Sequence, residues 1–116
     1  MQEELLFVYG SLQPGYRFPT QARAIKADRV HGLLYDLGEY PAAVQIDQVE
    51  DWFAGHLIAI PSELFQQLDD YEGVDEGLYR RIRTVTESGE STWIYEFIRS
   101  LPSTAVGPIT AWPSED

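Results

Sequence analysis

The sequence predicts an α+β fold, a small barrel of mixed or antiparallel strands with one helix packed alongside. The chain contains about six short segments typical of strands, separated by turn residues, and only one segment with the features of a firm helix. Strands and helices do not alternate regularly, which argues against a parallel, doubly wound sheet. The 116 residues suffice for one hydrophobic core, and we expect a single domain over residues 1–116.

The first half of the chain is expected to be mostly strand. Residues 4–9 form an apolar and aromatic run that is too short for a helix and ends at Gly10. Residues 11–20 contain two prolines and a glycine and are therefore expected to form a loop. Residues 21–27 are rich in helix formers and leave open a second, two-turn helix. Further strands are predicted at 29–37, which contains Gly32, at 42–46 and at 52–60.

The firm helix is predicted over residues 61–73. Ser62 is placed to cap its N-terminus, and Gly73 supplies the left-handed residue that ends it. Leu64, Leu68 and Tyr71 recur at helical spacing, so they are expected to share one buried face.

The segments after the helix predict a hairpin followed by an irregular end. Residues 79–87 and 91–98 have strand character and are joined by the turn Ser-Gly-Glu. Residues 100–116 contain three prolines and little periodicity, so they are expected to form an irregular C-terminal segment.

Composition and charge exclude several classes of function. Eight Lys and Arg against nineteen Asp and Glu give a net charge of −11, which disfavours binding to nucleic acid or to an anionic membrane. The chain has no cysteine, so it offers neither disulfides nor thiolate chemistry. His31 and His56 lack metal-ligand spacing and are expected to be packing residues, so no metal is expected. The acidic N-terminus is unlike a signal or transit peptide, which favours a cytoplasmic location.

Two short segments are left as candidates for chemistry. The first is Tyr9-Gly10-Ser11-Leu12, where a strand ends and the chain turns. Such a turn can direct backbone N–H groups into one concavity that binds a carboxylate or an oxyanion. The alternative is a plain transition from strand to loop, in which the glycine is needed only for steric reasons.

The second candidate is the acidic stretch Leu68–Gly73 with the residues that follow it. Most of its carboxylates are expected to be solvated surface groups. Glu72 differs because it lies in the last helical turn, where unpaired carbonyls and the negative end of the helix dipole raise the proton affinity of a carboxylate. A glutamate with a raised pKa is suited to general base and general acid catalysis near neutral pH.

Four segments together resemble the gamma-glutamylcyclotransferase-like superfamily in its short, single-domain form. They are FVYGSL at residues 7–12, GLLYDLGEYPA at 32–42, LDDYEGVDEGLYRR at 68–81 and WIYEF at 93–97. They occur in the order found in the family and span most of the chain. The resemblance implies a compact mixed barrel with a flanking helix and a cavity at one end.

The resemblance also implies which residues act. Glu72 corresponds to the catalytic glutamate, and Tyr9, Gly10, Ser11 and Leu12 correspond to the loop that binds the glutamyl end of the substrate. Two further substrate-binding residues are implied, Tyr95 in the last strand and Arg80 at the start of an earlier one, beside Tyr79.

The implied reaction converts a small gamma-glutamyl amino acid or gamma-glutamyl amine to 5-oxoproline and a free amine. The substrate's own α-amine is the nucleophile, so no cofactor is expected. The expected partner is this small molecule, and neither nucleic acid nor a membrane is expected. The oligomeric state and the leaving amine stay open. An alternative function is that of a non-catalytic or differently reacting small-molecule binding barrel that retains the cavity. A further alternative is a role in protein interaction.

Overall fold

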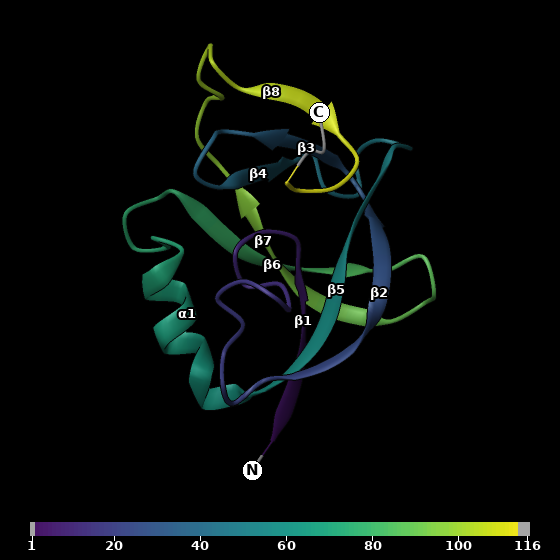
Figure 1. Ribbon diagram of the computed structural model, residues 1–116, viewed down its shortest axis with the longest axis vertical. Helices are drawn as coiled ribbons and strands as arrows, with labels where there is room; N and C mark the ends of the chain where they lie inside the picture. Colours follow the sequence, from purple (N-terminus) through teal and green to yellow (C-terminus); the bar gives the residue numbers. More distant parts are fainter. Residues whose placement is uncertain (1, 114–116) are drawn as a thin grey trace.

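The computed structural model describes residues 2–113. These residues form eight strands and a short α-helix, and Figure 1 shows the helix to one side of the strands. No helix within these residues has both the length and the apolar character needed to cross a membrane. The elements are β1 (Glu3–Val8), β2 (Arg23–His31), β3 (Leu33–Asp36), β4 (Pro41–Val44), β5 (Trp52–Pro61), a 3₁₀ turn (Ser62–Leu64), α1 (Phe65–Tyr71), β6 (Tyr79–Val85), β7 (Ser91–Phe97) and β8 (Val106–Ile109).

The strands form two sheets and not the predicted barrel of about six strands. One sheet has five strands in the order β2-β5-β1-β7-β6, and the other has three in the order β4-β3-β8. All pairings are antiparallel except that of β1 with β7, which is parallel. The expected mixed α+β class is therefore confirmed, whereas the strands within residues 2–113 do not close into a barrel.

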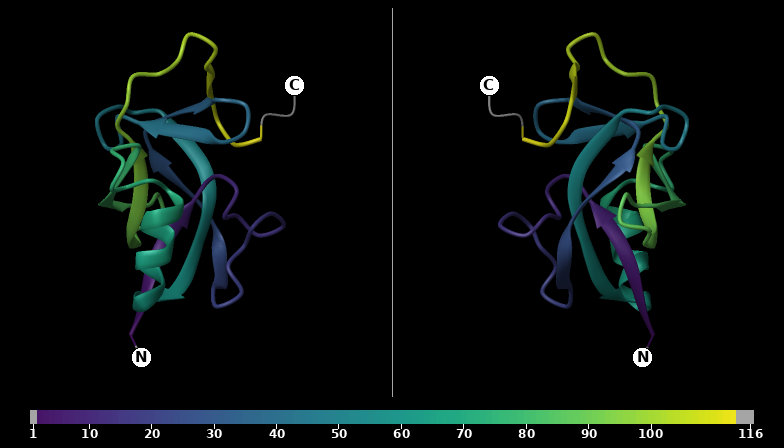
Figure 2. Two further views of the ribbon diagram at one scale, coloured as in Figure 1. Left: turned by 90° about the vertical axis from the view of Figure 1, so that its left-hand side faces the viewer. Right: turned by 90° about the vertical axis from the view of Figure 1, so that its right-hand side faces the viewer.

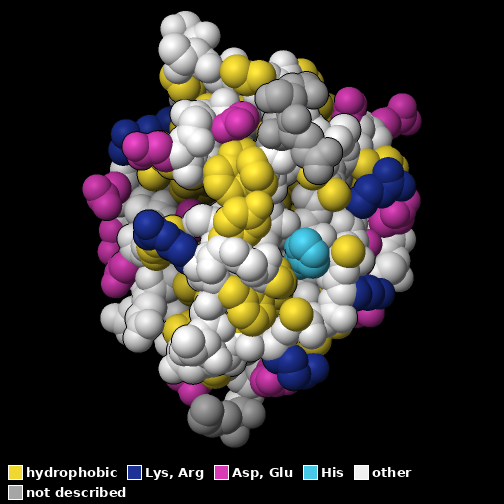
Figure 3. Space-filling view, in the orientation of Figure 1, with side chains coloured by type: hydrophobic (Ala, Val, Ile, Leu, Met, Phe, Trp, Pro, Cys, Tyr) yellow, Lys and Arg dark blue, Asp and Glu magenta, His cyan; other side chains and the backbone are white. Residues whose placement is uncertain are grey.

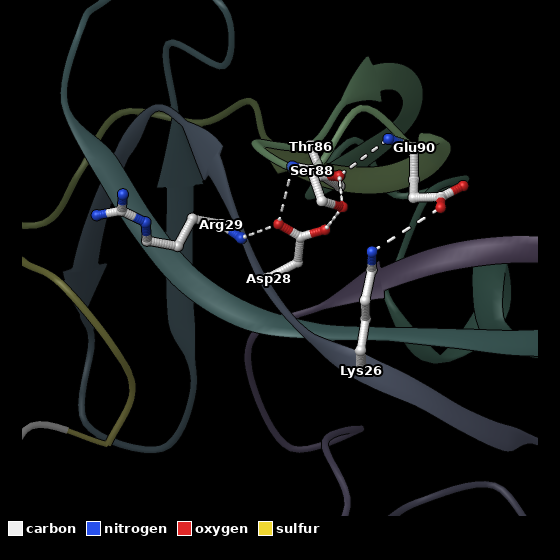
Figure 4. Close-up of polar contacts among 6 residues, drawn as sticks. All are labelled: Lys26, Asp28, Arg29, Thr86, Ser88 and Glu90. Carbon is white, nitrogen blue, oxygen red and sulfur yellow. Dashed lines mark hydrogen bonds and ion pairs between the residues drawn. The ribbon is translucent and has the colours of Figure 1, made fainter.

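The five-stranded sheet nevertheless curls until its two edges approach each other. The turn between β6 and β7 reaches β2, which is the strand at the opposite edge. The backbone N–H of Glu87 donates to the carbonyl of Arg29 at 2.8 Å. Asp28 accepts hydrogen bonds from the backbone N–H and the hydroxyl of Ser88 (Figure 4). These contacts fix the curvature of the sheet at one point.

The core has two parts, one on each side of β1. Leu6 and Val8 belong to the cluster that α1 covers, whereas Phe7 and Tyr9 belong to the cluster that includes Leu34 of β3. Successive side chains of a strand point to opposite faces, so this central strand is buried on both sides. Its end, where the chain leaves the sheet, therefore lies between the two clusters.

The second helix that was left open at residues 21–27 is not formed. Residues 23–31 form strand β2 instead, in antiparallel register with β5. Helix propensity is a weak preference, and here the ladder of hydrogen bonds with β5 outweighs it. The strand predicted at 29–37 is two strands, because the chain passes from one sheet to the other at Gly32.

The firm helix is present but begins differently from the prediction. Ser62 makes no side-chain capping hydrogen bond, and a 3₁₀ turn precedes α1. Leu64 and Leu68 are buried as expected. Tyr71 is 48% exposed, so its assignment to the buried face was wrong. Its position at the end of the helix takes its ring beyond the edge of the core.

The C-terminal segment is not wholly irregular. Residues 106–109 form β8, which pairs with β3, and this part of the prediction was wrong. Trp112 receives a hydrogen bond at its carbonyl from the Gln13 side chain, and its ring lies 6.0 Å from that of Tyr16. Figure 2 shows the segment that follows β8, up to residue 113, and the loop after β1 on the same side of the five-stranded sheet. Residues 114–116 lie outside the described residues.

Candidate functional site

A cavity of about 660 Å³ lies at the end of β1. Figure 1 shows the loop that follows β1 crossing the front of the molecule beside α1. In the same orientation, hydrophobic side chains gather along the middle of this face and most charged side chains lie toward its edges (Figure 3). The cavity is lined by residues 7–12, 17, 39–41, 71–72, 78–79 and 95, so segments distant in sequence meet there.

Glu72 reaches this cavity because of the way in which α1 ends. The N–H of Gly73 bonds to the carbonyl of Asp70 at 3.1 Å, and that of Val74 to the carbonyl of Asp69 at 3.0 Å. These two bonds form a Schellman motif, in which the residue after the cap must adopt a left-handed conformation. Gly73 has a φ of +67°, and glycine adopts it without strain. The motif thus makes Glu72 the C-terminal cap of α1, directly before the chain reverses direction at Gly73.

Burial of the Glu72 carboxyl raises its pKa to about 7. Desolvation disfavours the charged form of a carboxyl group, and no arginine or lysine side chain pairs with Glu72 among the described residues. Burial also raises the pKa of Tyr9 and Tyr79, and the negative charge of Glu72 adds to both effects. Near neutral pH the site therefore has one group able both to accept and to donate a proton.

The loop after β1 approaches the β3–β4 region closely. A Cβ atom on Gly10 would lie 2.9 Å from two ring carbons of Pro41, so this position requires glycine for steric reasons. The steric explanation considered for Gly10 therefore holds. It does not exclude a binding role, because the N–H groups of Gly10, Ser11 and Leu12 donate to no protein acceptor among the described residues. The Ser11 hydroxyl also shares a hydrogen bond of 2.8 Å with the Tyr71 hydroxyl.

Tyr95 lines the cavity, and its hydroxyl is held in place by Asp69 and, through Asp69, by Arg81. Its hydroxyl donates to Asp69 at 2.7 Å. Arg81 holds the same carboxylate with two hydrogen bonds, of 3.0 and 3.2 Å. The guanidinium of Arg81 lies 4.0 Å from the ring centre of Phe65 and 4.6 Å from that of Trp93. Asp69 and Arg81 are thus structural partners of Tyr95 and not freely solvated surface groups.

Arg80 is placed differently from the other residues singled out in the sequence. Six of the seven, Tyr9, Gly10, Ser11, Leu12, Glu72 and Tyr95, line the cavity, but Arg80 does not. Its guanidinium pairs with Glu96 at 2.7 Å. Glu96 is buried and also accepts a hydrogen bond from the N–H of Ile46. In this structure Arg80 therefore joins β6 to β7 and to the loop after β4.

Among the other residues that line the cavity, four carry polar groups and were not marked as contacts in the sequence. They are Arg17, Glu39, Tyr40 and Tyr71. Tyr71 directly precedes Glu72, and Arg17 is the one cation in the loop 11–20. These two features of the sequence could have indicated that Tyr71 and Arg17 line the cavity. Glu39 and Tyr40 are brought to the cavity by the turn before β4, and no local pattern marks them.

The histidines lie in packing environments. The ring of His31 stacks on that of Trp52 with centroids 3.6 Å apart, and His56 shares a hydrogen bond of 3.0 Å with Gln13. Within residues 2–113, no group of three or more His, Cys, Asp and Glu side chains is arranged to hold a metal ion.

Comparison with known proteins agrees with the resemblance seen in the sequence. The family model described as "Gamma-glutamyl cyclotransferase, AIG2-like" matches residues 6–112. No curated protein matches this chain in sequence.

Solved structures share the fold. The protein ytfP from Escherichia coli is 27% identical, with a TM-score of 0.69, and the match covers 94% of this chain and 96% of that one. An aig2-like protein from Mus musculus is 18% identical, with a TM-score of 0.72 and coverage of 100% and 92%. A protein entitled gamma-glutamyl cyclotransferase is 19% identical, with a TM-score of 0.61 and coverage of 83% and 67%.

Proposed function

This chain belongs to the gamma-glutamyl cyclotransferase, AIG2-like family, and on that premise we propose that it is a cyclotransferase acting on a small gamma-glutamyl compound. The products are 5-oxoproline and a free amine. The observation that carries the proposal is Glu72, whose pKa burial raises to about 7 and which lines the same cavity as the loop 9–12.

The proposed reaction forms one bond and breaks one. The substrate's α-amine nitrogen bonds to its own side-chain carbonyl carbon, which closes the five-membered ring. The bond from that carbon to the leaving nitrogen then breaks. The attacking nitrogen must lose a proton and the leaving nitrogen must gain one, so protons and electrons balance without a protein nucleophile.

Glu72 is proposed to carry that proton. The ionised carboxylate accepts it from the attacking amine, and the resulting acid donates it to the leaving nitrogen. A group with a pKa near the working pH serves both steps, because neither its acidic nor its basic form is scarce. An ordinary glutamate, with a pKa near 4.5, would be a weaker base toward the amine and almost wholly ionised at neutral pH.

The loop 9–12 is proposed to hold the glutamyl end of the substrate. Gly10, Ser11 and Leu12 have N–H groups that donate to no protein acceptor among the described residues, and such groups suit a carboxylate. Binding there would keep the amine close to the carbonyl carbon that it attacks, which lowers the entropic part of the barrier. Tyr95, held by Asp69, is proposed to form a fixed wall beside the reacting atoms.

The experiment that tests this function is turnover of a panel of gamma-glutamyl amino acids and gamma-glutamyl amines by purified protein. We expect 5-oxoproline and free amine to appear in equal amounts, and we expect Glu72→Gln to abolish their release while the variant remains folded. Asp70→Asn, which removes an exposed carboxylate from the same helix, is the matched control. Thermal stabilisation by these compounds without any turnover would instead support a non-catalytic binding domain.

A further inference from the structure

Arg17 differs from the other basic residues of the chain. The chain has eight Lys and Arg residues. Each of the others forms an ion pair or a hydrogen bond through its side chain; they are Arg23, Lys26, Arg29, Arg80, Arg81, Arg83 and Arg99. The guanidinium of Arg17 has no such partner within residues 2–113. Arg17 is exposed, so its guanidinium is free to bind an anionic ligand.

The position of Arg17 links the cavity to a second, smaller space. A groove of about 330 Å³ lies between the loop after β1 and α1. Arg17, Leu12 and Tyr71 line both the cavity and this groove. A molecule that extends from the cavity along α1 would therefore pass Arg17.

The two spaces differ in the charged side chains that line them. The cavity lining includes two carboxylates, Glu39 and Glu72, in addition to Arg17. The groove lining includes Arg17 and no carboxylate, and its other members are neutral, such as Thr20, Gln21 and Gln67. Apart from the N–H groups of residues 10–12, the cavity therefore offers an anionic group a less favourable charge than the groove does. The planar guanidinium matches the geometry of a carboxylate, which it can bind with two parallel hydrogen bonds.

We propose that Arg17 binds a carboxylate on the leaving group of the substrate and thereby selects gamma-glutamyl α-amino acids over gamma-glutamyl amines. This inference rests on the proposed function. A gamma-glutamyl α-amino acid carries two carboxylates, and the site offers two separate sets of donors. The N–H groups of residues 10–12 receive the carboxylate of the glutamyl end, and Arg17 receives that of the leaving amino acid.

A matched pair of compounds tests the selection. Gamma-glutamyl-alanine and gamma-glutamyl-ethylamide differ only in the carboxylate of the leaving group. We expect wild-type protein to have the higher kcat/KM for gamma-glutamyl-alanine, and Arg17→Gln to lower that value roughly tenfold, the lower end for a hydrogen bond to a charged group. The value for the ethylamide should stay unchanged. Arg23→Gln, which removes an exposed arginine that lines neither space, should change neither.

Equal losses for the two compounds in Arg17→Gln would overturn the inference, because they would place Arg17 at the glutamyl end. No loss for either compound would overturn it as well. Both results leave the proposed reaction intact.

Binding to Glu72→Gln separates failure of this inference from failure of the proposed function. Calorimetry with the two compounds, with and without the additional Arg17→Gln substitution, measures selection without turnover. If wild-type protein turns over neither compound but Glu72→Gln binds gamma-glutamyl-alanine more tightly through Arg17, the proposed reaction fails and the selection stands. If there is neither turnover nor a difference in binding, both are overturned.

Discussion

Replacement of Glu72 by glutamine should change how the stability of the protein depends on pH. Burial raises the pKa of Glu72 from 4.5 to about 7, so the folded state binds this proton more tightly than the unfolded state does. The associated stabilisation is fully present below pH 4.5, declines as the pH rises, and is lost above pH 7. Glutamine has nearly the same shape and does not titrate.

The size of the effect follows from the shift in pKa. A shift of about 2.5 units at about 1.36 kcal/mol each gives about 3 kcal/mol in total. Between pH 5.5 and pH 8, where ordinary carboxylates stay ionised, about 2 kcal/mol of this remains to be lost. Over that range the free energy of unfolding of Glu72→Gln should rise by about 2 kcal/mol relative to the wild type.

Urea-induced unfolding at half-unit intervals of pH measures this difference. The Asp70→Asn variant removes a negative charge from an exposed position on the same helix, and its difference from the wild type is subtracted to correct for net charge. A difference between Glu72→Gln and wild type that stays constant to within about 0.5 kcal/mol would refute the reasoning. Glu72 would then titrate as a solvated carboxyl group, and the case for one group serving as base and acid would be lost.

Two further substitutions test the walls of the cavity. Tyr95→Phe removes the hydroxyl that donates to Asp69. The loss of this hydrogen bond should lower the free energy of unfolding at pH 7 by about 1 kcal/mol. An unchanged midpoint of urea-induced unfolding would show that the hydrogen bond does not stabilise the fold. Gly10→Ala places a methyl group 2.9 Å from the Pro41 ring, and the resulting shift of the loop should lower kcat/KM for 5-oxoproline release by roughly tenfold or more. Unchanged kinetics in that variant would contradict the proposed role of the loop.

Sequence patterns correctly predicted the strands and the helix end that are determined by residues close together in the sequence. The β6–β7 hairpin, β1 and β5 were expected from apolar runs bounded by turn residues, and they are present. Gly73 was expected to end the helix and does so with a φ of +67°. The resemblance to the gamma-glutamylcyclotransferase-like superfamily rested on four ordered segments and is confirmed by the match over residues 6–112.

The errors arose where distant parts of the chain decide the local structure. Residues 23–27 have helix-forming composition, but pairing with β5 makes them a strand. Residues 106–109 contain a proline and little periodicity, yet pairing with β3 makes them β8. The barrel was not predicted correctly because closure depends on whether β2 and β6 pair, and only a turn beside β6 reaches β2.

The same distinction applies to the site. Glu72 was identifiable because its helix end and the glycine after it adjoin it in sequence. The partner of Arg80 was not identifiable, since Glu96 lies on another strand. Nor was the network that joins Arg81, Asp69 and Tyr95, because it spans β6, α1 and β7. Tyr71 was assigned to the core because it follows Leu64 and Leu68 at helical spacing. Helical spacing does not show how far along the helix the core extends, and Tyr71 lies beyond its edge.

The pH dependence of kcat/KM for 5-oxoproline release tests the central claim most directly. If Glu72, with a pKa of about 7, accepts the proton of the attacking amine, kcat/KM should fall on the acidic side with an apparent pKa of about 7. Glu72→Gln should show no such acidic limb in any activity that remains. An acidic limb near pH 4.5 in the wild type, or an unchanged profile in Glu72→Gln, would contradict the assignment of Glu72 as the catalytic base.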